Sequence, residues 1–407
     1  MSTKASRLTS SVCFALFLCL MAAGCGGVGS STTAGPNPTP TPPPGSTPTP
    51  TPVPAGTTAF LYVGNVGSVR QVGGSVSGFK VNADGTLAPV PGSPFKTDSG
   101  TAIVKSDPQG RFVFIGEDHT TPGARGTNCL AEPSILLVKR VDPASGTLTQ
   151  VNNITLRGSC VRDIAVDPSG THLYAGVSNI TTSGGSIQGF LIGGTGTLTE
   201  LPGSPVMVED LPFSIAMHPS GKFIYAATPN LSVLDRDTTT GALTVRGVFS
   251  TPKRHMALNP SGTFLTASER DTNEISEFLV DSAGNVTETF GGRKPAKVPD
   301  GVGADPLGQF FVVTEFIDAN NHGGLSTLKQ ETPNGEYLKT NTAPFGNGNN
   351  PASPVFDPTG RFVYASFAGD GTVQGFVLDR NANKLTAIGK PIVTGDTPIS
   401  VTVVQPH

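Results

Sequence analysis

The densest group of chemically useful side chains lies between residues 251 and 269, which read TPKRHMALNPSGTFLTASE. This stretch contains Arg254, His255 and Glu269. A guanidinium can stabilise a developing negative charge, and an imidazole or a carboxylate can accept and return a proton. These three residues are therefore candidate catalytic residues. The sequence leaves open an alternative, in which they form an ion-pair and hydrogen-bond cluster without a catalytic role.

Further polar residues are candidates for ligand binding. They are Glu117, His119, Arg162, Asp163, Arg270 and Glu315. The run Glu117-Asp118-His119 could bind a metal ion, but no second His or Asp stands at ligand spacing, so we expect no metal. The chain also lacks GxSxG, HExxH and a phosphate-binding loop. We therefore expect no cofactor.

A repeat along the chain must position these residues. A polar residue followed by Pro, any residue and Gly occurs six times, with the prolines 41 to 60 residues apart. These prolines are Pro108, Pro168, Pro219, Pro260, Pro306 and Pro358. A short β-like run precedes and follows each one, such as IAV and THLYAG around Pro168. Two runs around such a turn predict a β-hairpin.

Two more short runs follow each hairpin. One of them produces the recurring phrases LAPVPGSPF at 87–95 and LTELPGSPV at 198–206, which we interpret as a fourth strand and the turn that leaves it. Four-stranded units of this period predict the blades of an all-β propeller, and no helical periodicity competes with them.

The two ends of the repeat set the number of blades. AFLYVGN at Ala59 matches a second strand, and ISVTVVQPH at Ile399 matches a first strand. The sequence thus predicts seven four-stranded blades over 57–407, with the C-terminal strand completing the N-terminal blade. In this topology the loops that enter the first strands and the ends of the second strands share one face around the central channel. All the candidate residues lie at these positions.

The pattern of Arg254, a short strand, Asn259-Pro-Ser-Gly, a second strand and Glu269 resembles the lactonase-type seven-bladed propellers. That family includes 6-phosphogluconolactonases and carboxymuconate lactonising enzymes, and the resemblance covers nearly all of 59–407. It implies that Arg254 and Glu269 correspond to an Arg and a Glu that the family uses. The family also uses a His and a second Arg, where this chain has Phe213 and Glu315. The spacing from Arg254 to Glu269 is one residue shorter than usual, and one residue reverses the face to which a strand side chain points.

These departures favour a binding or scaffold module that uses the channel face for an unknown small molecule or protein. A lactone hydrolase is the alternative, with Arg254 stabilising charge at the ring carbonyl and His255, Glu269 or His119 transferring the proton. A third hypothesis is that the protein has a purely structural role in the cell envelope.

The N-terminus predicts export. A basic start is followed by the apolar run Val12–Ala23, which is too short to span a bilayer. Ala22-Ala23-Gly24-Cys25 resembles the lipobox of bacterial lipoproteins, which implies that Cys25 carries the lipid and anchors the protein to the cell envelope. An ordinary secretory signal is the alternative. We thus expect a signal peptide over 1–24 and, over 25–56, the lipidated cysteine with a Pro/Thr-rich linker.

Cysteine usage and charge complete these expectations. The exported domain would keep Cys129 and Cys160, and two cysteines in an exported domain usually form a disulfide. The formal net charge of −3 gives no reason to expect nucleic acid as a partner. We expect the propeller to be monomeric.

Overall fold

The computed structural model describes residues 59–67, 73–119, 131–179, 184–209, 211–228, 230–249, 254–289, 294–295, 297–316, 322–330 and 337–406. The chain divides into two units, Met1–Ser46 and Thr47–His407, and every described residue belongs to the second unit. The predicted signal peptide, Cys25 and most of the linker thus lie outside the described residues. None of the residues that the structure describes forms a helix that is long and apolar enough to span a bilayer.

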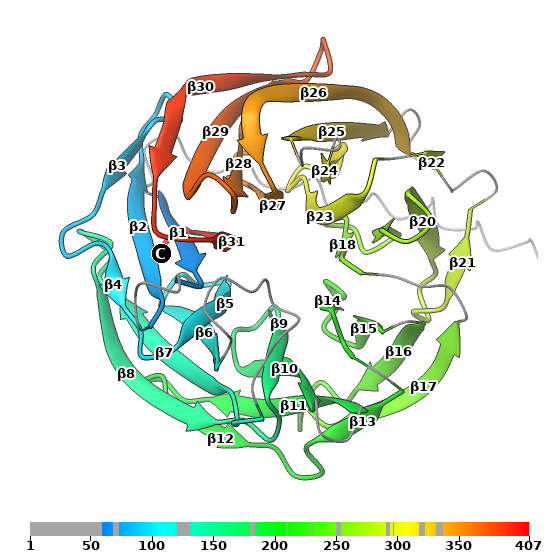
Figure 1. Cartoon of the computed structure of the whole chain (residues 1–407). Coiled ribbons are helices and arrows are strands. Elements are labelled where there is room, and N and C mark those ends of the chain that lie inside the picture. Colours follow the sequence, from blue (N-terminus) through cyan, green and yellow to red (C-terminus); the bar gives the residue numbers. More distant parts are fainter. Residues whose placement is uncertain are drawn as a thin grey trace, which may run out of the picture. The chain divides into compact units, whose positions relative to one another are not determined.

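The described residues form seven antiparallel sheets arranged as a ring, which confirms the predicted seven-bladed propeller (Figure 1). Blade 1 contains β1 (Ala59–Asn65), β2 (Ser75–Val81), β3 (Leu87–Pro89), β4 (Phe95–Lys96) and β31 (Pro398–Val404). Blade 2 contains β5 (Gly100–Ser106), β6 (Phe112–Asp118), β7 (Ile135–Val141) and β8 (Leu148–Thr155). Blade 3 contains β9 (Cys160–Val166), β10 (His172–Asn179), β11 (Gly184–Ile192), β12 (Leu198–Glu200) and β13 (Val206–Val208).

The remaining four blades follow in chain order. Blade 4 contains β14 (Ser214–Met217), β15 (Phe223–Ala227), β16 (Leu231–Arg236) and β17 (Leu243–Phe249). Blade 5 contains β18 (Met256–Leu258), β19 (Phe264–Glu269), β20 (Glu274–Val280), β21 (Val286–Glu288) and β22 (Lys294–Pro295). Blade 6 contains β23 (Pro299–Ala304), β24 (Phe310–Phe316), β25 (His322–Gln330) and β26 (Tyr337–Asn349). Blade 7 contains β27 (Pro351–Phe356), β28 (Phe362–Phe367), β29 (Thr372–Asp379) and β30 (Lys384–Val393).

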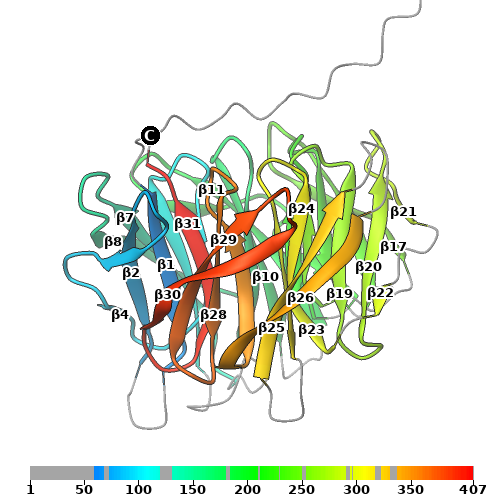
Figure 2. The ribbon, with the colours of Figure 1, turned by 90° about the horizontal axis from the view of Figure 1, so that it is seen from above.

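The ring closes as predicted, because β31 from the C-terminus pairs with β1 from the N-terminus. Phe60 lies opposite Val404, and Val63 lies opposite Val401. Blade 1 thereby gains its innermost strand from the other end of the chain, and β31 sits in the ring of inner strands in Figure 1. Viewed from the edge, the strands run across the thickness of the ring (Figure 2).

The repeated Pro-x-Gly turns are explained by hydrogen bonds to their first residue. In blade 3 the Asp167 carboxylate accepts the backbone N–H groups of Thr171 and His172 at 2.8 and 2.7 Å. The turn glycine, Gly170, has a φ of +64°, a conformation that side chains with a Cβ rarely adopt. The polar residue and the glycine therefore recur because the turn geometry requires them.

The recurring phrase with PGSP differs from its predicted structure. The turn does not leave the fourth strand but interrupts it, since β4 and β13 pair again with the third strands β2 and β11. A serine in each turn replaces the missing backbone contact: Ser93 Oγ accepts the N–H of Gly78, and Ser204 Oγ accepts that of Gly189. Proline has no N–H to donate to the sheet, which explains the interruption.

Adjacent blades pack through buried apolar side chains, and four tyrosine hydroxyls add hydrogen bonds across the joints. Tyr62 of blade 1 donates to the Gly146 carbonyl of blade 2 at 2.6 Å. The other bonds of this kind are Tyr174 to Gly241, Tyr225 to Gly284 and Tyr364 to Gly85. Each acceptor glycine lies in the turn between the third and fourth strands of the next blade and has a positive φ.

Candidate functional site

A cavity of about 400 Å³ lies where the innermost strands meet. Its wall follows the repeat. The residue five positions before the turn Asp, Asn or His lines the cavity in blades 2 to 7. In that order these residues are Ala102, Arg162, Phe213, Arg254, Asp300 and Ala352. The residues that follow them also line it: Ile103, Asp163, Ser214, His255, Gly301 and Ser353.

Arg254, His255 and Asp300 form the group in this wall with the clearest catalytic chemistry. Asp300 Oδ1 lies 3.5 Å from His255 Nε2 and 4.0 Å from Arg254 Nε. The His255 side chain is 39% exposed, and the Asp300 side chain 15%. Thus two predicted catalytic residues are together in one cavity, next to a carboxylate that can orient the imidazole.

The other cavity carboxylates serve mainly as structural acceptors. Asp163 accepts the Ser214 hydroxyl at 3.1 Å and the Ile215 N–H at 2.9 Å, which ties blade 3 to blade 4. Asp118 does the same one blade earlier, since it accepts the Val161 N–H at 2.8 Å. These two side chains are buried, and their acceptor positions are largely used.

Cationic groups dominate what remains of the cavity lining. Arg162, Arg254 and Arg270 all line it, together with Lys105, whose ammonium lies 3.3 Å from Asp163. The Arg270 guanidinium carbon lies 5.2 Å from the centre of the Phe316 ring. A site with three guanidiniums suits a ligand that carries or develops negative charge.

Burial changes the protonation of several cavity groups. Partial desolvation within the cavity, with a smaller effect of the Arg254 charge, lowers the pKa of His255 below the usual imidazole value, so the ring is neutral at neutral pH and can accept a proton. Burial also raises the pKa of Asp118 to about 6. Burial lowers the pKa of Arg162; the Asp118 carboxylate opposes this shift, and the neighbouring Arg254 charge adds to it.

Three predicted site glutamates do not line the cavity. Glu117, Glu269 and Glu315 occupy the same position in their second strands, five residues after the first Phe. All three are at most 2% exposed. Glu269 accepts hydrogen bonds from Ser276 and from Thr272, the latter at 3.0 Å, and Glu315 accepts the Lys297 N–H at 2.9 Å.

The alternation of a β-strand explains this placement. Glu117 and Glu269 are each followed by a residue that does line the cavity, namely Asp118 and Arg270. The sequence correctly predicted that the ends of the second strands border the cavity. For Glu117 and Glu269, however, the next residue along the strand faces the cavity instead.

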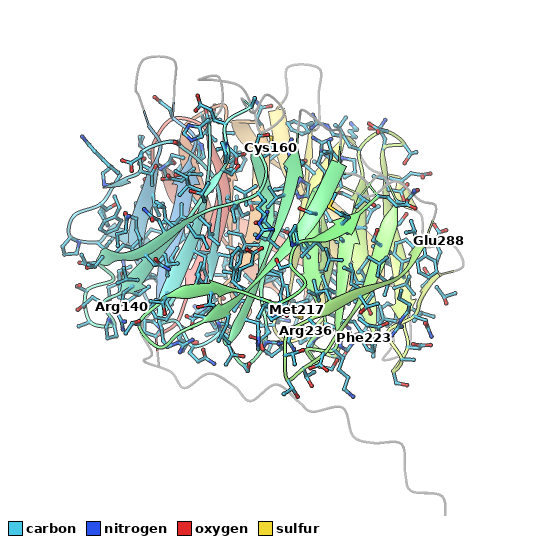
Figure 3. The ribbon with its side chains drawn as sticks, turned by 90° about the horizontal axis from the view of Figure 1, so that it is seen from below. Arg140, Cys160, Met217, Phe223, Arg236 and Glu288 are labelled. Atoms are coloured by element: carbon cyan, nitrogen blue, oxygen red, sulfur yellow. The ribbon has the colours of Figure 1, made fainter. Side chains whose placement is uncertain are left out.

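The remaining predicted positions lie outside the cavity or outside the described residues. His119 Nδ1 lies 3.2 Å from Glu132 Oε2, away from the cavity lining. Cys160 is buried at the start of β9, but Cys129 lies outside the described residues, so their pairing stays a prediction. Figure 3 shows Cys160 near one face of the ring and Arg236 and Phe223 near the opposite face, which carries the hairpin turns. Among the described residues, no three His, Cys, Asp or Glu side chains are grouped as a metal site would require.

Two charged residues of the cavity, Lys105 and Asp300, were missed by the sequence analysis. Asp300 lies five residues before Asp305, as Arg254 lies five residues before Asn259. Aligning the blades on their turn residues would have identified it. Lys105 lies two residues before its turn, within the inner strand rather than in the loop that enters it.

Comparison with known proteins supports this architecture. Residues 74–209 match the family model described as Lactonase, 7-bladed beta-propeller, so the resemblance to lactonase-type propellers is confirmed. A putative 6-phosphogluconolactonase from Bacteroides fragilis is similar in structure, with a TM-score of 0.69 and 17% identity over 87% of this chain and 100% of that one. The Pseudomonas aeruginosa periplasmic gluconolactonase PpgL has a TM-score of 0.66 and 16% identity, over 86% and 99% of the two chains. No match was found among curated proteins.

Proposed function

We propose that this lactonase-type seven-bladed propeller is a lactone hydrolase whose active site is the central cavity. The observation that carries the proposal is the meeting of Arg254, His255 and Asp300 in one cavity. The solved structures that resemble the chain, a putative 6-phosphogluconolactonase and a gluconolactonase, make a sugar lactone the first substrate to test.

The cavity residues suggest how the reaction would proceed. Neutral His255 accepts a proton from water while the water oxygen bonds to the lactone carbonyl carbon. The carbonyl oxygen becomes an oxyanion, which the Arg254 guanidinium stabilises. The bond between the carbonyl carbon and the ring oxygen then breaks, and the ring oxygen takes the proton. The product is an open-chain hydroxy acid, which is a carboxylate at neutral pH.

Hydrolysis of D-glucono-1,5-lactone by the purified full chain tests the proposal directly. We expect R254Q to lower kcat/KM about 100-fold, the range for losing one oxyanion-stabilising group. R246Q is the matched control, because Arg246 lies in β17, pairs with Asp235 and does not line the cavity. Turnover that survives R254Q unchanged would contradict this assignment.

The placement of Glu269 favours a second candidate function, a ligand-binding module without turnover. Glu269 is tied to Ser276 and Thr272 and does not line the cavity, so a carboxylate that the lactonase resemblance assigns to the site is missing from it. Ligand binding in the cavity without hydrolysis of any sugar, γ- or δ-lactone would support this function over the first.

We also propose that the propeller works outside the cytoplasm. The signal over 1–24 would direct export, and lipid on Cys25 with the linker over 25–56 would hold a domain spanning 57–407 away from a membrane. The similar P. aeruginosa protein is described as periplasmic. Incorporation of labelled palmitate by the full chain, and its loss in C25A, is the expected result. A chain that stays unlabelled in the cytoplasm would contradict export.

A further inference from the structure

Arg162 and Arg254 contact the same aromatic ring in the cavity wall. The Arg254 guanidinium carbon lies 4.9 Å from the centre of the Phe213 ring, and that of Arg162 lies 6.0 Å from it. The three residues come from consecutive blades and occupy the same position, five residues before the turn. The ring of equivalent positions therefore places Phe213 between the two arginines.

The backbone on either side of Phe213 is held firmly. The Phe213 N–H donates to the Ala227 carbonyl at 2.7 Å. The next two residues, Ser214 and Ile215, both donate to the Asp163 carboxylate. The aromatic ring is therefore a fixed support, on which guanidiniums are stabilised by the electron-rich face.

Two like charges would not normally be kept together unless something offsets their repulsion. The Arg254 charge contributes to the lowered pKa of Arg162, so each guanidinium is within electrostatic reach of the other. The Asp118 carboxylate offsets part of this repulsion at Arg162, whose Nε donates to Ser178 Oγ at 3.3 Å. Asp300 Oδ1 lies 4.0 Å from Arg254 Nε. Neither contact is the short bidentate ion pair that would saturate a guanidinium.

We propose that Arg162 and Arg254, supported by Phe213, form a subsite for the carboxylate of an open-chain hydroxy acid. This ligand identity rests on the proposed function, because hydrolysis of a lactone converts an uncharged ester into such a carboxylate. Phe213 is a positioning residue: it acts by keeping two guanidiniums directed at one anion. The subsite would therefore hold the product more strongly than the substrate and make the enzyme sensitive to product inhibition.

Calorimetric titration of the full chain with D-gluconate tests the subsite without requiring turnover. D-Glucitol is the matched ligand, because it differs from gluconate only in having a hydroxymethyl group in place of the carboxylate. We expect gluconate to bind at least about tenfold more tightly than glucitol, as a charge-assisted contact requires. If wild-type protein does not bind gluconate, or binds both ligands equally, the proposal is wrong whether or not lactones are hydrolysed.

Variants separate the roles of the ring and the charges. We expect R162Q and F213L each to weaken gluconate binding about tenfold, and F213Y, which keeps the ring, to retain it. R361Q is the control, since the Arg361 guanidinium also stacks on an aromatic ring, Phe362 at 4.9 Å, but does not line the cavity. Wild-type affinity in F213L would overturn the role of Phe213. Equally tight, Arg162-dependent binding of inorganic phosphate would show a general anion site and overturn the carboxylate assignment.

Lactone hydrolysis gives an independent readout. The proposed function fails if no lactone is turned over, whereas the subsite fails if gluconate binding does not depend on Phe213 and Arg162. In a hydrolytically active protein we expect F213L to raise the inhibition constant for gluconate more than it raises KM for the lactone. An equal change in both would contradict a subsite selective for the product.

Discussion

The two sides of the central cavity differ at equivalent positions of the repeat. Five residues before the turn, blades 3 to 6 present Arg162, Phe213, Arg254 and Asp300, whereas blades 2 and 7 present Ala102 and Ala352. We call the first set the charged arc and the second, Ala102 and Ala352, the small-residue arc. The backbone is thus equivalent in these blades. The side chain at one position decides whether a blade contributes a functional group to the cavity or leaves room in it.

The joints between blades show a related difference. Joints 7–1 and 1–2, beneath the small-residue arc, are both bridged by a tyrosine hydroxyl, from Tyr364 and Tyr62. In blades 5 and 6 the equivalent tyrosine position holds Thr266 and Val312. Blades 3 and 4 of the charged arc keep the tyrosine, as Tyr174 and Tyr225. Blades 5 and 6, which carry Arg254 and Asp300, therefore lack a hydrogen bond that the other half of the charged arc has.

The largest expected effect comes from removing His255, the proton acceptor next to Arg254 of the charged arc. We expect H255Q to lower kcat/KM for D-glucono-1,5-lactone by about 10²–10⁴, the usual contribution of general base catalysis. H218Q is the control, because His218 belongs to a hairpin turn, where it contacts the Gly262 carbonyl at 3.1 Å. A similar loss in both variants would mean that the effect is on folding and not on chemistry.

The pH dependence of kcat/KM tests the assignment of His255 as the proton acceptor. Since partial desolvation lowers the pKa of His255, kcat/KM should be level at neutral pH and fall only as the pH drops below the usual imidazole range near 6.5. Asp118 also lines the cavity, with a pKa of about 6. D118N should therefore keep the acid limb, while H255Q should lose it. A limb that disappears in D118N alone would assign the titration to the carboxylate.

The next largest effect concerns Glu117, a fully buried carboxyl group of β6. Burial, with a contribution from Asp98, raises the pKa of Glu117 from 4.5 to about 7. The folded state favours the protonated acid. The contribution of Glu117 to the free energy of unfolding is therefore fully favourable below pH 4.5 and is lost as the pH rises through 7. The shift corresponds to about 3 kcal/mol at most. We expect E117Q to match wild type at pH 4 and to be more stable at pH 8, measured by urea unfolding; a lower stability of E117Q at pH 8 would contradict this.

These glutamates also show how far the sequence could go. The Pro-x-Gly turns fixed the strand order, the blade number and the ring closure, because each turn has a local cause in a polar acceptor and a glycine. Side-chain direction was harder to predict, since Glu269 and Arg270 differ by one residue and face opposite ways. Asp300 was overlooked because its role appears only when the blades are aligned on their turns.

The small-residue arc predicts a smaller, steric effect. Leucine in place of Ala352 would extend into the cavity that the charged arc faces, so we expect A352L to raise KM about tenfold with little change in kcat, since about 1.4 kcal/mol of uniform binding would be lost. A365L is not a suitable control because Ala365 is buried in the core between blades. A382L changes an exposed turn residue instead. A fall in kcat alone would show that Ala352 does not border the bound substrate.

The smallest effect tests the joints themselves. Removing the hydroxyl in Y62F leaves the buried Gly146 carbonyl without this donor, and we expect a loss of about 1 kcal/mol in the free energy of unfolding. The reverse change is available in blade 2, where Phe114 holds the equivalent position and Gly196 the equivalent turn. F114Y would offer the missing donor and should stabilise the protein by up to about 1 kcal/mol. If Y62F does not change the free energy of unfolding, the hydrogen bond to Gly146 adds nothing beyond packing. If Y62F lowers stability and F114Y lowers it too, blades 2 and 3 are packed too closely to accept a hydroxyl at Phe114.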